Sequence, residues 1–285
     1  MTTTGNEVQY QLKNLTLTGL EFSPGKSKPV IISLHGWLDN AASFIPLAEY
    51  LPDYHIVAID LVGHGKSSHR CAGAHYHLVD NVQDIHELVT LNDWQEIYFV
   101  CHSMGGIIAS MYAACFPEIV KKLVLIESFG PLTMDPQTSA EQLRESVLSR
   151  IASEDKAQRH PDSLSSAVTA RMIAGKMNEA SATLLMQRNI NETDEGLRWR
   201  TDRRLRTLSS LRLIEEQANN FLQNINAPTL CILGTEGFEK LKVNVARRAS
   251  LVKNLTQNEV LGGHHVHMDN PQDTANCVTA FLEKD

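Results

Sequence analysis

The sequence lacks any hydrophobic run long enough to cross a membrane. A membrane-spanning helix needs about 20 consecutive apolar residues, and no stretch of the chain approaches that length. Residues 1–11 are polar and contain no apolar segment typical of a signal peptide. We therefore expect a protein without a membrane span and with a cytoplasmic location.

Cysteine is scarce, and its number and spacing argue against a fold stabilised by disulfides or by zinc. The number of cysteines is odd, and no two of them form a C-x-x-C motif. This pattern indicates reduced thiols in a cytoplasmic protein, and neither a disulfide framework nor a zinc site. The cysteines are Cys71, Cys101, Cys115, Cys231 and Cys277.

Positive charge is also in deficit. The chain of 285 residues has 26 Lys and Arg against 33 Asp and Glu, a formal net charge of −7. This balance disfavours nucleic acid or an anionic membrane as the main partner. The length and the 42% of hydrophobic residues fit one large soluble domain, or one domain with an insertion. A small molecule is the expected partner, and the oligomeric state stays open, a homodimer included.

Short apolar runs alternate with helical patterns along most of the chain. This alternation predicts an α/β fold in which parallel strands are joined by crossover helices. Residues 8–21 alternate apolar with polar side chains, which indicates antiparallel strands before the parallel part. Strands are expected at residues 30–34, 56–59, 97–100, 123–126 and 229–233 and near Val260, and helices at 81–91, 104–115, around 241–251 and after Pro271.

The alternation stops between residues 131 and 226. This stretch is rich in helix-forming residues and contains no convincing strand. We interpret it as a helical cap insertion over the carboxyl edge of the sheet, with residues 1–130 and 227–285 forming the core domain. The basic run Arg198–Arg206 within the insertion is expected to be a solvated, ion-paired helix face, although an anion site is conceivable.

The candidate nucleophile is Ser103. It follows an apolar strand and opens a helix, in the run Cys101-His102-Ser103-Met104-Gly105-Gly106. A serine there lies on a tight turn with its hydroxyl above the sheet, and small residues on either side let strand and helix pass closely. Gly105 meets this requirement, whereas Cys101 stands where glycine is usual. The alternative is a serine that only caps a helix.

An earlier strand ends at His35-Gly36-Trp37. The Trp37 amide in this loop, together with the Met104 amide, is expected to form an oxyanion hole. Gly36 is needed because a side chain there would block the approach. We expect Gly36 and His102 to line the substrate site.

Three histidines follow the last strand, in Gly262-Gly263-His264-His265-Val266-His267. His264 comes directly after the glycines and is the candidate general base, since a neutral imidazole can take the serine proton and return it. His265 and His267 are expected to pack in the core or to support the reacting residues from behind. A metal site is the alternative, but no H-E-x-x-H motif and few nearby carboxylates support it, so we expect no metal.

The triad acid should lie between the serine and the histidine in the chain. Glu127 ends the strand after the nucleophile helix and is favoured, with the role of orienting His264. The loop 234–239 offers Glu236 as the alternative, and Glu239 as a further one.

Two other polar segments follow strands. The run Asp60–Ser67 contains neither phosphate-binding glycine motif and is expected to be a structural turn that lines the site. Asp39 and Asn40 are expected to cap the next helix.

Together these motifs resemble the α/β-hydrolase superfamily over essentially the whole chain. The runs 35–44 and 200–205 resemble, more narrowly, the serine hydrolase-like group within it. The motifs that carry the wider resemblance are His35-Gly36-Trp37, Asp60 with Gly63-His64-Gly65-Lys66-Ser67, His102-Ser103-Met104-Gly105-Gly106 and Gly263-His264.

The resemblance implies an eight-stranded, mostly parallel sheet with helices on both faces, a helical cap, and acyl-enzyme chemistry without a cofactor. Members of the superfamily commonly carry an aspartate where this chain has Gly237, and some place their acid at the position of Glu127. The resemblance therefore strengthens Glu127. Ser103 excludes the aspartate nucleophile of epoxide hydrolases and haloalkane dehalogenases.

We expect a carboxylesterase-like serine hydrolase that cleaves a small or medium-chain ester. Leu184, Leu185 and Met186 would suit an acyl chain but are better explained as core. The motifs do not separate this activity from hydrolysis of a thioester, an amide or a carbon–carbon bond, or from cofactor-free perhydrolysis. A ligand-binding homologue that has lost the chemistry is the remaining alternative.

Overall fold

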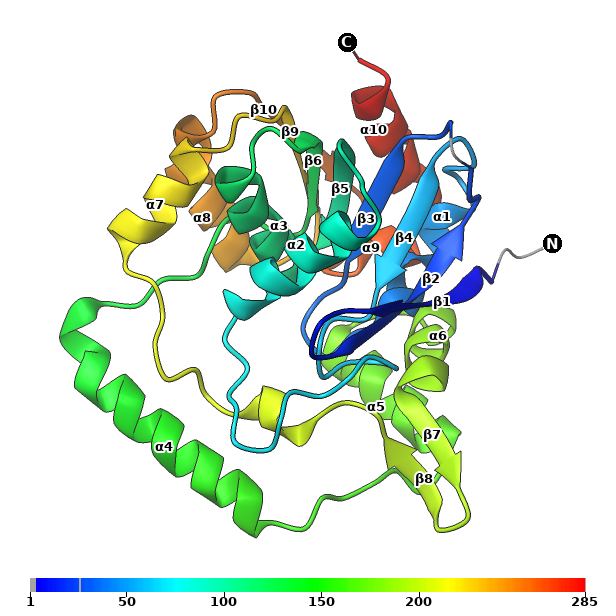
Figure 1. Ribbon diagram of the computed structural model, residues 1–285, viewed down its shortest axis with the longest axis vertical. Helices are drawn as coiled ribbons and strands as arrows, with labels where there is room; N and C mark the ends of the chain where they lie inside the picture. The colour runs from blue at the N-terminus through cyan, green and yellow to red at the C-terminus, as the bar shows by residue number, and fades with distance from the viewer. Residues whose placement is uncertain (1–3, 26, 285) are drawn as a thin grey trace.

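A computed structural model describes residues 4–25 and 27–284 of the protein. Its centre is an eight-stranded sheet of order β1-β2-β4-β3-β5-β6-β9-β10 (Figure 1). The pairs β1–β2 and β2–β4 are antiparallel, and the other neighbours are parallel. The expected mostly parallel sheet with an antiparallel start is thus confirmed. The strands are β1 (Asn6–Gln11), β2 (Thr16–Phe22), β3 (Val30–Leu34), β4 (His55–Ile59), β5 (Ile97–His102), β6 (Val120–Ile126), β9 (Thr229–Gly234) and β10 (Leu255–Val260).

Helices cover both faces of this sheet, as expected. Successive residues of a strand point to opposite faces, so Ile31 and Ile32 of β3 belong to different apolar clusters. The Ile32 cluster includes residues of α2 (Asp80–Leu91), α3 (Met104–Cys115) and α8 (Glu239–Arg248). The Ile31 cluster includes residues of α1 (Ile45–Ala48), α9 (Val266–Asp269) and α10 (Pro271–Leu282). Central strands buried on both faces explain the nearly continuous apolar runs in the sequence.

The insertion lies between β6 and β9 and is mainly helical. The expectation that residues 131–226 contain no strand is wrong, because β7 and β8 form an antiparallel hairpin. Gly196 opens β8 at φ 100°, a conformation that other residues rarely adopt. Its helices and strands are α4 (Ser139–Asp155), α5 (Leu164–Gly175), α6 (Glu179–Asn189), β7 (Ile190–Thr193), β8 (Gly196–Trp199) and α7 (Glu215–Gln223).

The expectation that the basic run 198–206 forms one face of a helix is wrong. It occupies the end of β8 and a short 3-10 helix, Arg203–Arg206. Ion pairing is present, since Arg198 pairs with Glu195 at 3.0 Å and Arg204 with Asp202 at 2.6 Å. Arg204 also donates to backbone carbonyls of the loop 70–74. The run therefore binds the insertion to a core loop.

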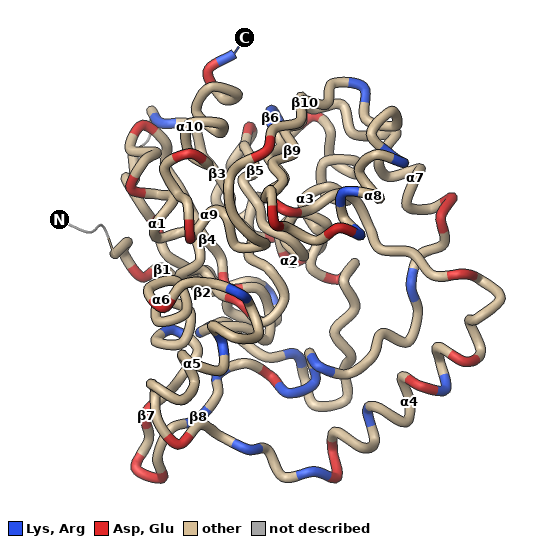
Figure 2. The backbone as a smooth tube through the Cα atoms, turned by 180° about the vertical axis from the view of Figure 1, so that it is seen from behind, with Lys and Arg blue, Asp and Glu red and all other residues tan. Residues whose placement is uncertain are grey.

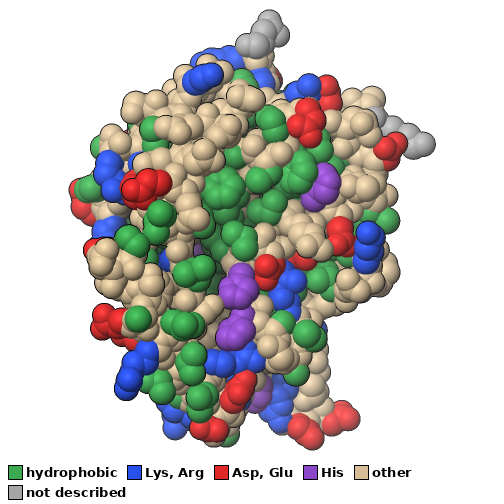
Figure 3. All heavy atoms as spheres, turned by 60° about the vertical axis from the view of Figure 1, so that its left-hand side comes forward, with side chains coloured by type: hydrophobic (Ala, Val, Ile, Leu, Met, Phe, Trp, Pro, Cys, Tyr) green, Lys and Arg blue, Asp and Glu red, His purple; other side chains and the backbone are tan. Residues whose placement is uncertain are grey.

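Helix α4 extends away from the sheet (Figure 1). Gln142 and Ser146 donate to the backbone of Ser209 and Leu208 at 3.3 and 2.8 Å. Acidic and basic residues alternate along the helix (Figure 2). Hydrophobic side chains gather toward the middle of the face that Figure 3 shows. The apolar residues that α4 exposes are Leu143, Val147, Leu148 and Ile151.

In the part of the chain that the structure describes, no helix combines the length and the apolarity that a membrane crossing requires.

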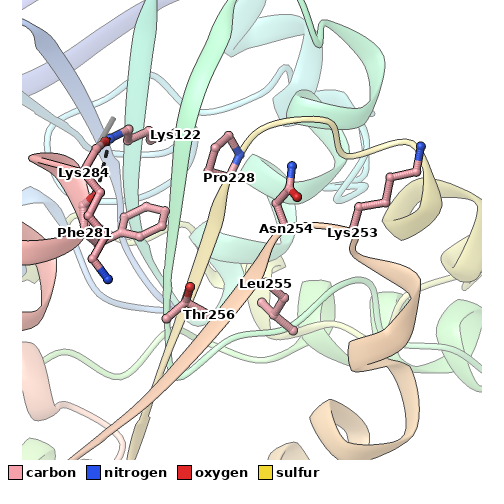
Figure 4. Close-up of a pocket in the computed structure, with 8 residues that line it drawn as sticks. All are labelled: Lys122, Pro228, Lys253, Asn254, Leu255, Thr256, Phe281 and Lys284. Atoms are coloured by element: carbon pink, nitrogen blue, oxygen red, sulfur yellow. Dashed lines mark hydrogen bonds between the residues drawn. The ribbon is translucent and has the colours of Figure 1, made fainter.

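A surface depression of about 280 Å³ lies at the start of β6, β9 and β10, away from their carboxyl ends (Figure 4). The residues that line it are Lys122, Pro228, Lys253, Asn254, Leu255, Thr256, Phe281 and Lys284.

Candidate active site

Ser103 lies on the turn between β5 and α3, with φ 48° and ψ −118°. Positive φ is strained for a residue with a side chain and is typical of functional turns. A Cβ at Gly105 would come within 2.0 Å of the Leu34 carbonyl oxygen, so only glycine lets α3 begin this close to β3. The Cys101 side chain is fully buried in the sheet core. The departure from glycine at position 101 therefore fits the packing of the turn.

His264 faces Ser103 from the loop after β10. Its Nε2 lies 3.0 Å from Ser103 Oγ, and its Nδ1 lies 3.0 Å from Glu127 Oε2. The two loops pack closely, because a Cβ at Gly234 would lie 2.6 Å from the carbonyl oxygens of Gly262 and Gly263. The structure thus joins the expected serine, histidine and acid in one hydrogen-bonded chain.

Glu127 is buried at the end of β6. Its Oε1 accepts from the Gly234 amide at 2.7 Å, and its Oε2 accepts from the Phe238 amide at 3.3 Å. A Cβ at Gly237 would lie 2.2 Å from Glu127 Oε1. The alternatives Glu236 and Glu239 are both exposed. Of the three glutamates, the structure places Glu127 against His264.

The two expected oxyanion donors lie at the same edge. The Gly105 amide donates to the His35 carbonyl at 3.0 Å, which places the loop 35–37 against the start of α3. Within residues 4–25 and 27–284, the backbone amides of Trp37 and Met104 have no protein acceptor. Free amides beside a serine can stabilise the negative charge of a tetrahedral intermediate. The half-exposed indole of Trp37 donates from Nε1 to the Leu205 carbonyl at 3.0 Å.

Gly36 and His102 are placed differently from the expectation that they line the substrate site. The His102 ring is fully buried and donates from Nε2 to the His264 carbonyl at 2.8 Å. Burial, with His267 and His264 nearby, holds the pKa of His102 well below its usual range, so the ring is neutral. A Cβ at Gly36 would lie 2.9 Å from His102 Nδ1. Gly36 therefore makes room for His102, and a buried ring such as His102 contacts only protein.

Asn40 caps a helix as expected, but Asp39 does not. The Asn40 side chain accepts from the Ala42 amide at 3.1 Å, at the start of the 3-10 helix Ala41–Phe44. Asp39 is buried and pairs with Arg171 of α5 and, at 3.3 Å, with His265 Nε2. Asp60 likewise pairs with an insertion residue, Arg188 of α6. Sequence reasoning missed these arginines because each lies more than a hundred residues from its partner.

Asp39, His102 and His265 offer ligand atoms within 4.8 Å of one another, a spacing compatible with a metal ion. However, Arg171 pairs with Asp39, and its Nη2 lies 3.2 Å from His265 Nε2. A guanidinium cation therefore already compensates the carboxylate. His267 is buried, and burial lowers its pKa to about 3, which fits the expected packing role.

Phe238 is a further site residue that the sequence did not indicate. Its ring packs on His264 with a centroid separation of 4.1 Å and an interplanar angle of 31°. The side chain is otherwise exposed. The loop 234–239 had drawn attention only for its glutamates, although an aromatic residue among them was a signal.

Comparisons with known proteins agree with this geometry. Residues 29–271 match the family model described as alpha/beta hydrolase fold. The chain is 30% identical over 278 residues to "Serine hydrolase-like protein" of Danio rerio, covering 94% of this chain and 85% of the relative. It is 32% identical over 277 residues to "Serine hydrolase-like protein 2" of Homo sapiens, covering 90% and 87%.

Solved structures show the same architecture. A hypothetical protein from Pseudomonas aeruginosa PAO1 superposes with a TM-score of 0.92 at 34% identity, covering 98% of this chain and 99% of that one. A thioesterase domain from the curacin biosynthetic pathway superposes with a TM-score of 0.84 at 23% identity, covering 96% and 99%, and shows the shared fold alone. The chain therefore belongs to the α/β-hydrolase family and, within it, to the serine hydrolase-like group.

Proposed function

We propose that the protein is a serine hydrolase that cleaves a small or medium-chain carboxylic ester through an acyl-enzyme intermediate. The observation that carries this proposal is the chain Ser103–His264–Glu127, with 3.0 Å at each of its two contacts. A nucleophile, a base within hydrogen-bond reach and a carboxylate that orients the base are the elements that acyl transfer requires.

The proposed reaction begins when Ser103 Oγ attacks the acyl carbonyl and passes its proton to His264 Nε2. The amides of Trp37 and Met104 donate to the oxyanion of the tetrahedral intermediate, and each such donor contributes about 3 kcal/mol of transition-state stabilisation. Collapse of the intermediate breaks the bond to the alcohol, which leaves with the proton from His264. A water molecule, deprotonated by His264, then releases the acid and restores Ser103.

Glu127 is proposed to hold His264 in the tautomer that leaves Nε2 free for the serine proton. In this tautomer Nδ1–H donates to Glu127 Oε2. The two backbone amides that donate to Glu127 stabilise its negative charge in a buried position. The carboxylate in turn stabilises the imidazolium that forms during attack.

The insertion is proposed to act as a cap over this site. Arg171 of α5 and Leu205 both contact the turn that carries Trp37. Leu185 and Met186 are buried in an apolar cluster that the insertion forms with Met268 of α9, which supports the view that they are core. The acyl chain would therefore contact exposed apolar residues near the serine, among which Trp37 and Phe238 are candidates.

The test is hydrolysis of p-nitrophenyl esters of increasing acyl chain length by wild type and by Ser103→Ala. We expect wild type to hydrolyse short or medium-chain esters and the variant to lose this activity, with unchanged melting temperature. Hydrolysis rates on matched thioester and amide substrates separate the ester hydrolase from its rivals. A second panel of substrates tests hydrolysis of a carbon–carbon bond. A folded wild type that turns over none of these substrates would favour the ligand-binding alternative.

A further inference from the structure

The insertion contacts the turn 36–40, called here the oxyanion turn because it carries the proposed oxyanion donor Trp37. Three of its side chains contact three separate insertion segments: the 3-10 helix Arg203–Arg206, helix α5 and helix α6. The contacts are Trp37 Nε1 to the Leu205 carbonyl at 3.0 Å, Asp39 to Arg171, and Asn40 Nδ2 to the Leu185 carbonyl at 2.9 Å. The position of the insertion and the shape of this turn are therefore linked.

Asp39 is the residue through which this link reaches the rest of the site. Burial raises the pKa of its carboxyl, but the Arg171 charge and the His265 hydrogen bond outweigh burial and hold the pKa well below its usual range. The carboxylate is thus ionised, with Oδ1 facing Arg171 and Oδ2 lying 3.3 Å from His265 Nε2 and 3.7 Å from His102 Nδ1.

The same residue fixes the backbone of the turn. The Asp39 amide donates to the Gly36 carbonyl at 3.1 Å, which closes the turn around Trp37. A Cβ at Gly36 would lie 2.9 Å from Asp39 Oδ2, so the carboxylate packs directly against the turn. A displaced carboxylate would leave space into which the turn could move.

Asp39 also borders the loop of the proposed base. His102, beside Asp39 Oδ2, donates to the carbonyl of His264 at 2.8 Å, and His265 follows His264 in the chain. One carboxylate therefore contacts both the turn with the oxyanion donor and the loop with the base. Both must stay within a fraction of an ångström of their places, since a displacement of 1 Å can cost about a hundredfold in rate.

We propose that Arg171 and Asp39 are positioning residues that couple the insertion to the oxyanion turn and the His264 loop. They do not contact the substrate or the reacting atoms. This inference rests on the proposed serine hydrolase function for its kinetic consequences, but its structural consequence, order in the turn 36–40, does not depend on that function.

A second buried pair between the insertion and the core provides a matched control. Arg188 Nε donates to both oxygens of Asp60 at 3.0 Å. Asp60 also accepts from the amides of Ala41 and Lys66 at 2.7 and 2.8 Å. This pair has the chemistry of the Arg171–Asp39 pair but lies at the end of β4, and within the described residues no hydrogen bond or ion pair joins it to the histidine loop 262–267.

The kinetic test compares Arg171→Met with Arg188→Met on an ester that wild type hydrolyses. We expect Arg171→Met to lower kcat by about 10- to 100-fold while KM changes little, because misplaced catalytic groups slow the chemical step. Arg171→Lys should recover part of the loss, since the charge is restored. Arg188→Met should lower the melting temperature without a comparable loss of kcat. Equal kcat losses in the two methionine variants, or none in either, would overturn the proposal.

Hydrogen–deuterium exchange separates this inference from the proposed function. The Asp39 amide donates to the Gly36 carbonyl within the turn. Arg171→Met should speed the exchange of this amide by more than tenfold and Arg188→Met should not, whether or not any ester is hydrolysed. Unchanged exchange in Arg171→Met overturns the coupling. Should Arg171→Met not fold, Asp39→Asn, which keeps the side-chain shape and removes the charge, replaces it in both measurements.

Discussion

The carboxylate of Glu127 fills the space that a side chain at position 237 would need. A Cβ at Gly237 would lie 2.2 Å from Glu127 Oε1 and 2.6 Å from its Cδ. The Glu127 carboxylate in its present position and a side chain at position 237 therefore exclude each other. If Glu127 is the triad acid, as we propose, glycine at 237 is the residue that leaves room for it.

Replacing the acid should abolish most of the proposed activity. Glu127→Gln keeps the shape of the side chain but removes the charge that stabilises the His264 imidazolium. We expect kcat to fall by about ten-thousandfold, as in the comparable change in serine proteases. Steady-state kinetics on an ester checks this, with Glu236→Gln as the control at an exposed position. If the Glu236 variant shows the larger loss, the assignment of the acid is wrong.

The exclusion between positions 127 and 237 can be tested without changing the acid itself. Gly237→Ala should push the Glu127 carboxylate away from His264 and lower kcat by at least about tenfold, because the base loses its orienting partner. Gly73→Ala is the matched control, since a Cβ at Gly73 meets nothing within 4 Å. Full activity in Gly237→Ala would show that the carboxylate can shift without cost.

The side chain of Cys101 should matter for stability and not for catalysis. It is fully buried, so its removal leaves a cavity, and glycine adds a backbone entropy cost. We expect Cys101→Gly to lower the free energy of unfolding by about 1–3 kcal/mol and to leave kcat/KM within about twofold. Urea unfolding and ester kinetics measure the two effects. A tenfold change in kcat/KM in either direction would contradict this separation.

Stability should fall on acidification before most carboxylates titrate. Burial lowers the pKa of His35 to about 4 and of His64 and His267 to about 3, and it lowers that of His102 strongly. Below the unfolded value, about 6.5, the unfolded chain binds protons that the folded chain does not. The free energy of unfolding is therefore greatest above that pH and decreases from about 6.5 toward 4.

His267→Leu should remove one of the protons that only the unfolded chain binds in this pH range. In the described structure neither ring nitrogen of His267 has a hydrogen-bond partner, so the substitution sacrifices no such bond. We expect the slope of unfolding free energy against pH, between about 6.5 and 4, to decrease by about 1.4 kcal/mol per pH unit relative to wild type. Urea unfolding at several pH values gives both slopes. Identical slopes would show that His267 is protonated in the folded state.

The regular elements near the site could be predicted from sequence because their apolar runs are uninterrupted. Helix α3 and strand β3 have the expected bounds, Met104–Cys115 and Val30–Leu34. The hairpin of β7 and β8 was missed, because its strands have four residues each and show little apolar alternation. Their pairing depends on a tight turn at residues 194–195, which Gly196 follows, and the helix-forming residues around it obscured this signal.

The proposed site also has a part that the sequence predicts and a part that it does not. Ser103, Glu127 and His264 each follow a strand of one parallel sheet, and topology alone brings such residues to one edge. Asp39 and Arg171 are 132 positions apart, and nothing local relates them. Aspartate and asparagine both cap helices, so the sequence did not show that Asn40 alone would do so. The contacts between the insertion and the oxyanion turn could therefore be found only in the structure.

Covalent labelling shows whether Ser103 is the nucleophile. Wild type and Ser103→Ala are incubated with a fluorophosphonate, and the intact masses and the labelled peptide are determined by mass spectrometry. We predict one adduct per chain, located on Ser103, and none on the variant. No adduct on a folded wild type, or equal labelling of the variant, would contradict it.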